Sequence, residues 1–168
     1  MNNEACLVII KPDAIQRGLT GLVYSRLEEC GLQLVAIKAA RVTRALAEEH
    51  YYTLKQKPFF EDLIRHICGK LHGVDYVLVM VFWGPGAIGK IRELAGATNP
   101  EKAEPQSLRG AYGRNTAAGI MENVVHASSD QAESEREIKL WFMPDELLAL
   151  PYKTKNQTLL NHQTTVWA

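Results

Sequence analysis

A short apolar run near the N-terminus restricts the fold more than any other feature of this chain. Residues Ala5 to Ile10 read Ala-Cys-Leu-Val-Ile-Ile, without a polar side chain and rich in branched residues. A strand with one face in water alternates apolar and polar positions, so this run predicts a strand that is covered on both faces and central in its sheet. It ends abruptly at Lys11-Pro12-Asp13, where proline fixes a turn. Lys11 then points a cation either into a crevice or into solvent.

The remaining periodicities predict alternating helices and strands. They favour a helix over 20–30, a strand over 32–42, a helix from the cap Thr43 to His50, helical spacing over 59–67, the strongest strand over 74–83 and a helix over 87–95. A short extended run at 124–125 leads to Ser128-Ser129-Asp130, which are helix-starting residues before an amphipathic helix over 131–142. This order predicts an α+β sandwich with helices mainly on one face of a small sheet. Residues 1–150 are expected to form one domain, and 151–168 a polar tail.

The composition restricts the possible partners and compartments. Among the 168 residues, Lys plus Arg and Asp plus Glu both number 19, so no global field favours nucleic acid or an anionic membrane. Cys6, Cys30 and Cys68 are widely spaced and support neither a disulfide framework nor a zinc site, which fits a reducing cytoplasm. No apolar run is long enough to span a bilayer, and the N-terminus lacks the basic start of a secretory signal.

A glycine-rich turn invites a nucleotide-binding interpretation that the neighbouring residues argue against. Gly84-Pro85-Gly86-Ala87-Ile88-Gly89-Lys90 lies between a strand and a helix, as the dinucleotide and P-loop motifs require. The P-loop needs a hydroxyl after its lysine to hold magnesium, and Ile91 stands there. The dinucleotide motif needs an acidic residue after a following parallel strand, and Glu104 lies in an irregular segment instead. A plain turn is therefore the preferred interpretation.

Regular hydrophobic periodicity stops between Ala97 and Met121, immediately before the segment that contains His126. A connection of this length in a compact domain is usually functional or disordered. It carries Arg109 and precedes the extended run that ends at His126. A histidine at such a junction is by itself more often a hydrogen-bonded structural residue than a catalytic one. Residues elsewhere in the chain must decide between the two.

The chain also carries side chains that suit a nucleoside triphosphate. Cations and polar donors suit the phosphates, an aromatic ring suits a base, and a histidine can attack phosphorus. The candidates are Lys11, Tyr51, Phe59, Arg92, Thr98, Arg109, Asn123, His126 and Glu137.

At these positions the chain resembles the nucleoside diphosphate kinase family. The resembling pieces occur in the family's order and cover nearly all of the chain to Leu148. They are Ile10-Lys11-Pro12-Asp13-Ala14-Ile15-Gln16-Arg17-Gly18, Glu48-Glu49-His50-Tyr51, Lys57-Pro58-Phe59-Phe60, Arg92-Glu93-Leu94, Gly96-Ala97-Thr98-Asn99-Pro100, Leu108-Arg109-Gly110, Asn123-Val124-Val125-His126-Ala127-Ser128, Glu135-Arg136-Glu137-Ile138 and Leu140-Trp141-Phe142.

The resemblance implies a fold, a reaction and a role for each residue. The fold would be a ferredoxin-like βαββαβ sandwich with a four-stranded antiparallel sheet. In a ping-pong reaction, ATP would phosphorylate His126, and a nucleoside diphosphate would then take the phosphoryl group. Glu137 would hold the other ring nitrogen, with Ser128 as an orienting residue and with Lys11 and Tyr51 also catalytic. The nucleotide would be bound by Lys11, Phe59, Leu63, Arg92, Thr98, Arg109 and Asn123. Mg²⁺ would be held mainly by the phosphates, without metal-binding residues of the protein's own, and the chain would form a tetramer or hexamer.

Several positions depart from the family's pattern. Ala127 replaces the usual glycine after the histidine, and Ser129-Asp130 reverses the usual order of aspartate and serine. Ala111 replaces an acidic residue, and the segments 68–75 and 110–122 are longer than usual. Arg114-Asn115 imitates the family's Arg-Asn pair but lies too far from the histidine, so the binding role falls to Asn123.

Two other functions remain open on the sequence. The same element order serves RNA-recognition modules, in which Tyr76 and Phe82 would stack on bases, although the zero net charge and the missing aromatic-basic signature disfavour this alternative. The chain could also be a catalytically inactive relative that acts as a scaffold, which the retained histidine and phosphate-suited residues disfavour.

Overall fold

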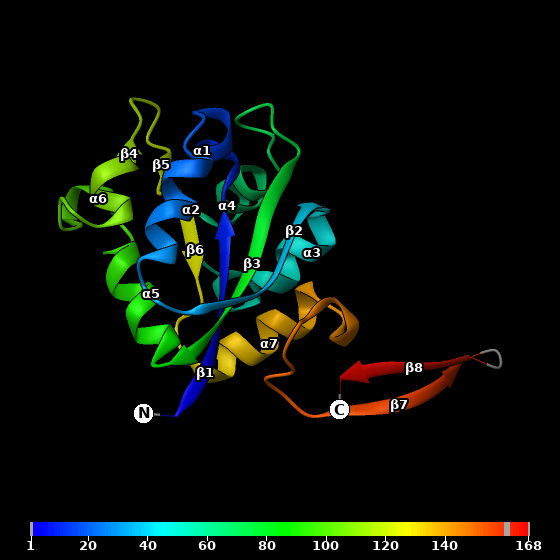
Figure 1. Ribbon diagram of the computed structural model, residues 1–168. Helices are drawn as coiled ribbons and strands as arrows, with labels where there is room; N and C mark the ends of the chain where they lie inside the picture. The colour runs from blue at the N-terminus through cyan, green and yellow to red at the C-terminus, as the bar shows by residue number, and fades with distance from the viewer. Residues whose placement is uncertain (1, 160–161, 168) are drawn as a thin grey trace.

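A four-stranded antiparallel sheet forms the centre of the computed structural model, which describes residues 2–159 and 162–167. Its spatial order is β2-β3-β1-β6, with β1 at Asn3–Ile10, β2 at Gln33–Arg41, β3 at Tyr76–Pro85 and β6 at Val125–Ala127. The strand β1 pairs with β3 on one side and with β6 on the other, so it is central as predicted (Figure 1). This sheet and its helices confirm the predicted ferredoxin-like α+β fold.

Helices cover both faces of this sheet. Ala5, Leu7 and Ile9 of β1 belong to one apolar cluster, whereas Cys6, Val8 and Ile10 belong to a second. The first cluster packs against α3 (Arg44–His50), α4 (Phe60–Ile67) and α7 (Gln131–Trp141), and the second against α1 (Pro12–Gln16), α2 (Thr20–Glu28), α5 (Ala87–Ala95) and α6 (Leu108–Tyr112). The expectation that helices lie mainly on one face was therefore wrong. The unbroken apolar run of β1 already required two covered faces.

Local capping explains where two of the site-bearing helices begin. Thr43 accepts a hydrogen bond from the Leu46 backbone N–H at the start of α3, as predicted. Asp130 accepts one from the Glu133 backbone N–H at the start of α7, so the reversed Ser129-Asp130 order still caps the helix. The short helix α1 was predicted only as a turn, because five residues beginning at Pro12 carry no helical period.

The segment predicted to be irregular contains short regular elements. It holds the 3₁₀ turn η2 (Pro100–Lys102), the helix α6 capped by Ser107, and the two-residue strands β4 (Arg114–Asn115) and β5 (Met121–Glu122). Each of these is too short for a hydrophobic period to reveal it. Two further 3₁₀ turns are η1 (Tyr52–Leu54) and η3 (Pro144–Glu146).

The C-terminal segment forms a hairpin that projects beside the sandwich (Figure 1). Its strands, β7 (Thr154–Leu159) and β8 (His162–Trp167), pair antiparallel. The Trp167 indole N–H donates to the Phe142 carbonyl at 2.8 Å, which ties the hairpin to the end of α7. The prediction of a polar tail missed this element because few apolar residues mark its strands.

Two sequence alternatives can be judged from the fold. Phe82 is only 1 % exposed within the second apolar cluster, so it is not available to stack on an RNA base. In the glycine-rich stretch, Gly84 and Pro85 end β3, Ala87 begins α5, and Gly86 between them forms the turn in a left-handed conformation (φ 63°). Within the described residues, the helices are all too short or too polar to cross a membrane.

Candidate active site

His126 lies on β6 directly after a strained turn. Val124 has φ 56° and is the one non-glycine residue with positive φ in the described chain. Its N–H donates to the Asp13 carboxylate at 3.0 Å, and its carbonyl accepts from the Lys11 backbone N–H at 2.9 Å. Such a conformation costs free energy and persists only when its surroundings fix it. The end of β1 and the start of α1 therefore hold the turn that presents His126.

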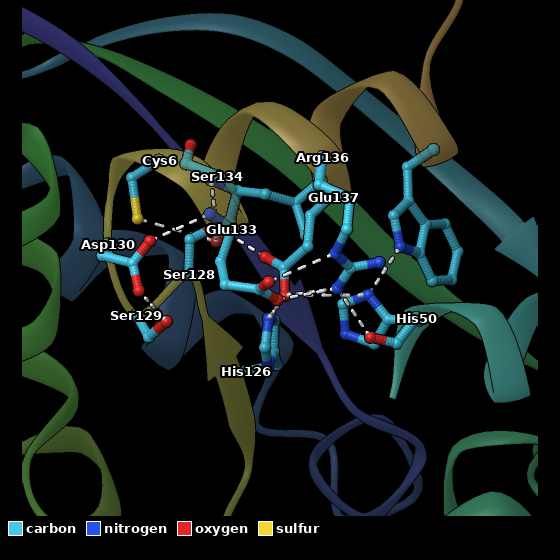
Figure 2. A network of polar contacts seen from close by, with 12 residues as sticks. Cys6, His50, His126, Ser128, Ser129, Asp130, Glu133, Ser134, Arg136 and Glu137 are labelled. Carbon is cyan, nitrogen blue, oxygen red and sulfur yellow. Dashed lines mark hydrogen bonds and ion pairs between the residues drawn. The ribbon is translucent and has the colours of Figure 1, made fainter. Parts of the chain in front are cut away.

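A buried carboxylate holds the imidazole of His126. Glu137 Oε1 lies 2.8 Å from His126 Nε2, and Glu137 Oε2 accepts a 2.6 Å hydrogen bond from the Ser128 hydroxyl (Figure 2). Glu137 is only 3 % exposed, so water does not compete strongly for these bonds. With the carboxylate ionised, Nε2 carries the proton and Nδ1 keeps its lone pair. The sequence-predicted residues His126, Glu137 and Ser128 are thus brought together.

Aromatic rings form one wall of the site. The His50 ring lies edge-on at 4.5 Å from the His126 ring and at 4.4 Å from that of Tyr51. The Trp141 indole N–H donates to His50 Nδ1 at 3.1 Å, so the His50 proton resides on Nε2. Burial, reinforced by His126 and nearby cations, lowers the pKa of His50 well below its usual range. His50 is therefore a neutral ring.

His50 was not among the sequence-predicted site residues. One feature of the sequence could have identified His50 as a site residue. It lies between Glu49 and the predicted Tyr51, at the end of an amphipathic helix. The Tyr51 hydroxyl is buried without a hydrogen-bond partner in the described residues, and burial raises its pKa. An unpaired buried hydroxyl beside His126 is available to a ligand.

A buried and a half-buried cation, Lys11 and Arg109, lie on the other side of the turn. Lys11 Nζ donates to Asn123 Oδ1 at 2.6 Å, and burial lowers the pKa of Lys11 to about 8. Arg109 donates to the carbonyls of Gly96 and Val125 at 2.7 and 3.0 Å. Burial, followed by repulsion from Arg92, lowers the pKa of Arg109 to about 10. Desolvated cations that repel each other, as Arg109 repels Lys11, favour an anionic ligand beside them.

The remaining predicted residues lie at the exposed rim. Arg92 on α5 and Thr98 after it are exposed, and the Thr98 carbonyl accepts from the Asn123 amide at 2.9 Å. Phe59 is 53 % exposed at the start of α4, with Leu63 one turn further along. The structure records no direct contact between Phe59 and His126. An exposed aromatic ring at a helix start is nevertheless well placed to stack on a ligand.

The alternative pair Arg114-Asn115 lies in a separate hairpin. Arg114 donates to Glu122 at 2.6 Å, and the Asn115 amide donates to Asn99 at 3.1 Å. Asn123, by contrast, contacts Lys11 directly. Asn123 therefore stays the candidate binding residue of the two.

Comparison with known proteins gives one family. The family model described as nucleoside diphosphate kinase matches residues 4–147. The nucleoside diphosphate kinase of Symbiobacterium thermophilum is 50 % identical over 139 residues, covering 83 % of this chain and 87 % of the relative. That of Thermococcus kodakarensis is 49 % identical over 144 residues, covering 86 % of this chain and 79 % of the relative.

Solved structures lead to the same family. A transition-state mimic of the Borrelia burgdorferi nucleoside diphosphate kinase with bound vanadate and ADP superposes with a TM-score of 0.79 at 34 % identity, covering 88 % of this chain and 92 % of that one. The Halobacterium salinarum enzyme in complex with CDP gives 0.78 at 38 % identity, covering 89 % and 93 %. With the family model matching most of the sequence, this chain belongs to the nucleoside diphosphate kinase family.

Proposed function

We propose that His126 is the residue through which this nucleoside diphosphate kinase carries the phosphoryl group from ATP to nucleoside diphosphates. The observation that carries the proposal is the hydrogen bond between His126 Nε2 and the buried Glu137 carboxylate, 2.8 Å long. It fixes the tautomer that leaves the Nδ1 lone pair free to attack. Ser128, which donates to the second Glu137 oxygen at 2.6 Å, keeps that carboxylate aligned.

The transfer consists of two half-reactions at one site. Nδ1 of His126 forms a bond to the γ-phosphorus of ATP, the bond from that phosphorus to the β-γ bridging oxygen breaks, and ADP leaves. In the second half, a terminal phosphate oxygen of a nucleoside diphosphate attacks the phosphohistidine, and the Nδ1–P bond breaks. The ring gains positive charge while phosphorylated, and Glu137 balances that charge at Nε2. No proton needs to leave the ring in either half, which suits a pair of similar, reversible steps.

The surrounding residues would position the phosphates and the nucleoside. Phosphoryl transfer depends mainly on alignment and on neutralising the equatorial oxygens. Lys11, Arg92 and Arg109 are the cations proposed for this role, and Thr98, Asn123 and Tyr51 are the proposed hydrogen-bond donors. Phe59 and Leu63 would contact the base. A stacked ring recognises the π-face of a base, so this arrangement would accept many bases.

The side chains at the described site suit a magnesium ion that is held by the phosphates of the nucleotide and not by the protein. Both Glu137 oxygens are engaged, and the group of His50, His126 and Glu137, in which only His126 is half-buried, is rich in nitrogen. Mg²⁺ prefers oxygen ligands and retains water, so phosphate oxygens suit it better than these side chains. When bound, the ion supplies charge neutralisation on the phosphates. We therefore propose Mg²⁺ as a cofactor held by the nucleotide.

A labelling experiment tests the role of His126. Brief incubation with γ-labelled ATP should transfer label to the wild-type protein, and the bond should be labile in acid and stable in base. His126→Ala should abolish the label, whereas His162→Gln, in the C-terminal hairpin, should keep it. Label that survives His126→Ala, or that resists acid, would remove His126 from the reaction. Added nucleoside diphosphate should discharge the labelled wild-type protein.

We also propose an assembly, a domain boundary and a compartment. Residues 1–150 would form the catalytic unit, and 151–168 an appendage. The chain would form a homo-oligomer, a tetramer or hexamer, for which the exposed Leu22, Ile37 and Leu148 offer apolar contact area. Light scattering distinguishes the two sizes, and a monomer would contradict the proposal. The free Cys6, Cys30 and Cys68 suit the cytoplasm.

A further inference from the structure

A second buried cluster of titratable side chains lies behind the turn that carries His126. Asp13 on α1, His66 on α4 and His72 in the connection from α4 to β3 each place a potential ligand atom within 4.8 Å of the other two. All three are buried, with exposed fractions of 0 %, 4 % and 8 %. The elements that bear them gather at the end of the sheet where β1 stops (Figure 1).

The contacts inside this cluster leave a buried nitrogen of His72 without a hydrogen-bond partner among the described residues. His66 Nε2 lies 2.9 Å from Asp13 Oδ1, and the His66 and His72 rings pack edge-on at 4.7 Å. His72 Nδ1 lies 3.9 Å from the buried Glu122 carboxylate. His72 Nε2 is buried and has no hydrogen-bond partner among the described residues. Buried imidazole nitrogens are normally satisfied, so this atom requires an explanation.

We propose that Asp13, His66 and His72 bind a divalent transition metal ion of the zinc class, at a site separate from the nucleotide. Two imidazoles and a carboxylate are a donor set that zinc and its neighbours prefer and that magnesium does not. In a tetrahedral site with metal–ligand bonds near 2.0–2.2 Å, ligand atoms lie about 3.4 Å apart. The three atoms, now 2.9 to 4.8 Å apart, would need to move by only about 1 Å.

Glu122 would complete the site without contacting the metal. A histidine that ligates through Nε2 commonly donates its Nδ1–H to a carboxylate, which fixes its tautomer and orientation. Glu122 faces His72 Nδ1 and is held by Arg114 at 2.6 Å. An ion on His66 Nε2 would take the place of the present contact with Asp13 Oδ1, and the His66 ring proton would then lie on Nδ1.

The local backbone holds His72 in place. Gly69 has φ 75°, and a Cβ added there would lie 1.7 Å from the Val74 carbonyl oxygen. The Gly69 carbonyl accepts from the N–H groups of His72 and Gly73 at 3.3 and 3.0 Å. The longer segment 68–75 is thus a compact loop that returns His72 to the cluster. A histidine side chain on a fixed loop loses little conformational entropy when it binds a metal ion.

The metal would also be linked to the strained turn. Asp13 uses Oδ1 toward His66 and Oδ2 toward the Val124 N–H, at 2.9 and 3.0 Å. A metal ion on Oδ1 would fix the carboxylate that holds Val124, two residues before His126. The proposal does not depend on the role of His126, because the two sites use different side chains.

Metal titration of the full-length, chelator-stripped protein tests this inference. Co²⁺ is the probe, read by its visible absorption in excess Mg²⁺, and Zn²⁺ is then added in competition. We expect one Co²⁺ per chain, displaced by Zn²⁺. His66→Gln and His72→Asn should each weaken binding by more than about 100-fold, and Glu122→Gln by about 10- to 100-fold. His126→Ala is the matched control and should bind as the wild type does, because it alters the other histidine cluster.

A measurement on the wild-type protein tests the site even if the variants misfold. X-ray absorption of bound Zn²⁺ should show two imidazoles with oxygen ligands and no sulfur. The inference is overturned if the wild type binds no Co²⁺ in excess Mg²⁺, if bound Zn²⁺ shows sulfur ligands, or if His126→Ala rather than His72→Asn abolishes binding. Loss of phosphohistidine labelling with metal binding intact would contradict only the proposed function.

Discussion

At the scale of single residues, the site works by fixing protonation states with burial. Glu137 is buried with both oxygens hydrogen-bonded, so His126 is held in one tautomer. His50 is buried beside it and stays neutral because its pKa is well below the usual range. Burial lowers the pKa of Lys11 to about 8, which is closer to neutral pH than the value of about 10 for Arg109. Lys11 therefore offers a direct test of the electrostatic description.

Nucleotide binding should take up a proton above the pKa of Lys11. In the free protein, burial lowers that pKa to about 8, so Lys11 is mostly charged at neutral pH and mostly neutral near pH 9. Phosphate beside the amine favours the charged form and raises its pKa, so ADP binding at about pH 9 should consume up to about one proton, and at about pH 7 very little. Affinity should accordingly fall as pH rises through 8.

Calorimetry in two buffers of different ionisation enthalpy measures this uptake. Lys11→Gln serves as the control, because it keeps a polar side chain at the same place without a titrating amine. The variant should bind ADP more weakly and take up no additional proton near pH 9. An equal proton count at both pH values in the wild type would mean that Lys11 does not face the phosphates.

At the scale of elements, the helix α6 presents Arg109 through a single cap. Ser107 accepts from the Gly110 N–H at 3.2 Å and donates to the Glu104 carbonyl at 2.7 Å, and it is only 4 % exposed. Ser107→Ala removes both bonds where water cannot easily replace them, which should cost about 1–2 kcal/mol of unfolding free energy. Because α6 bears Arg109, loss of its cap should also raise the KM for ADP more than it lowers kcat.

Thermal unfolding and steady-state kinetics check that expectation together. A loss of this size should lower Tm by about 2–8 °C in a chain of this length. Gln106→Ala is the neighbouring control, since its exposed side chain does not cap the helix, and it should change neither quantity. If KM stays constant while Tm falls, α6 would be a structural support without influence on the nucleotide.

The elements also show what periodicity can and cannot predict. The continuous apolar run of β1 predicted a central strand, and Thr43 predicted the start of α3, because each signal is local and carries its own physical reason. The helices α1 and α6 span five residues each, which is under two turns, so no period could reveal them. His66 and His72 join Asp13 only through tertiary folding, so nothing in their spacing predicted the cluster.

At the scale of the whole molecule, the described residues of the C-terminal segment contact α7 and its C-terminal end. Trp167 donates to the Phe142 carbonyl, and its ring lies 6.3 Å from that of Tyr152. The Tyr152 hydroxyl donates to Ser134 Oγ at 3.3 Å. The contacts lie at α7 and its C-terminal end, whereas His126 lies on β6. An isolated two-stranded hairpin is marginally stable, so these contacts are expected to hold it in place.

Trp167→Ala should therefore separate stability from activity. Removing a half-buried indole should cost about 1–3 kcal/mol, less than a fully buried tryptophan would. The rate of phosphoryl transfer should stay within about twofold of the wild type. Trp167→Phe, which keeps a ring but loses the donor to Phe142, should lose less stability. A large loss of kcat in either variant would place the hairpin inside the catalytic unit, contrary to the proposed boundary at residue 150.

Ser128 also contacts the central strand. Its backbone N–H donates to the Leu7 carbonyl at 3.1 Å, and its hydroxyl accepts from the Leu7 N–H at 3.2 Å. Because β1 is apolar on both faces, a slip of one residue would still bury hydrocarbon, and polar contacts such as these must select the correct pairing. The same hydroxyl orients Glu137. A molecule that paired β1 wrongly would also misplace the carboxylate proposed to hold His126, so specific activity should report the fraction of chains whose sheet is correctly aligned.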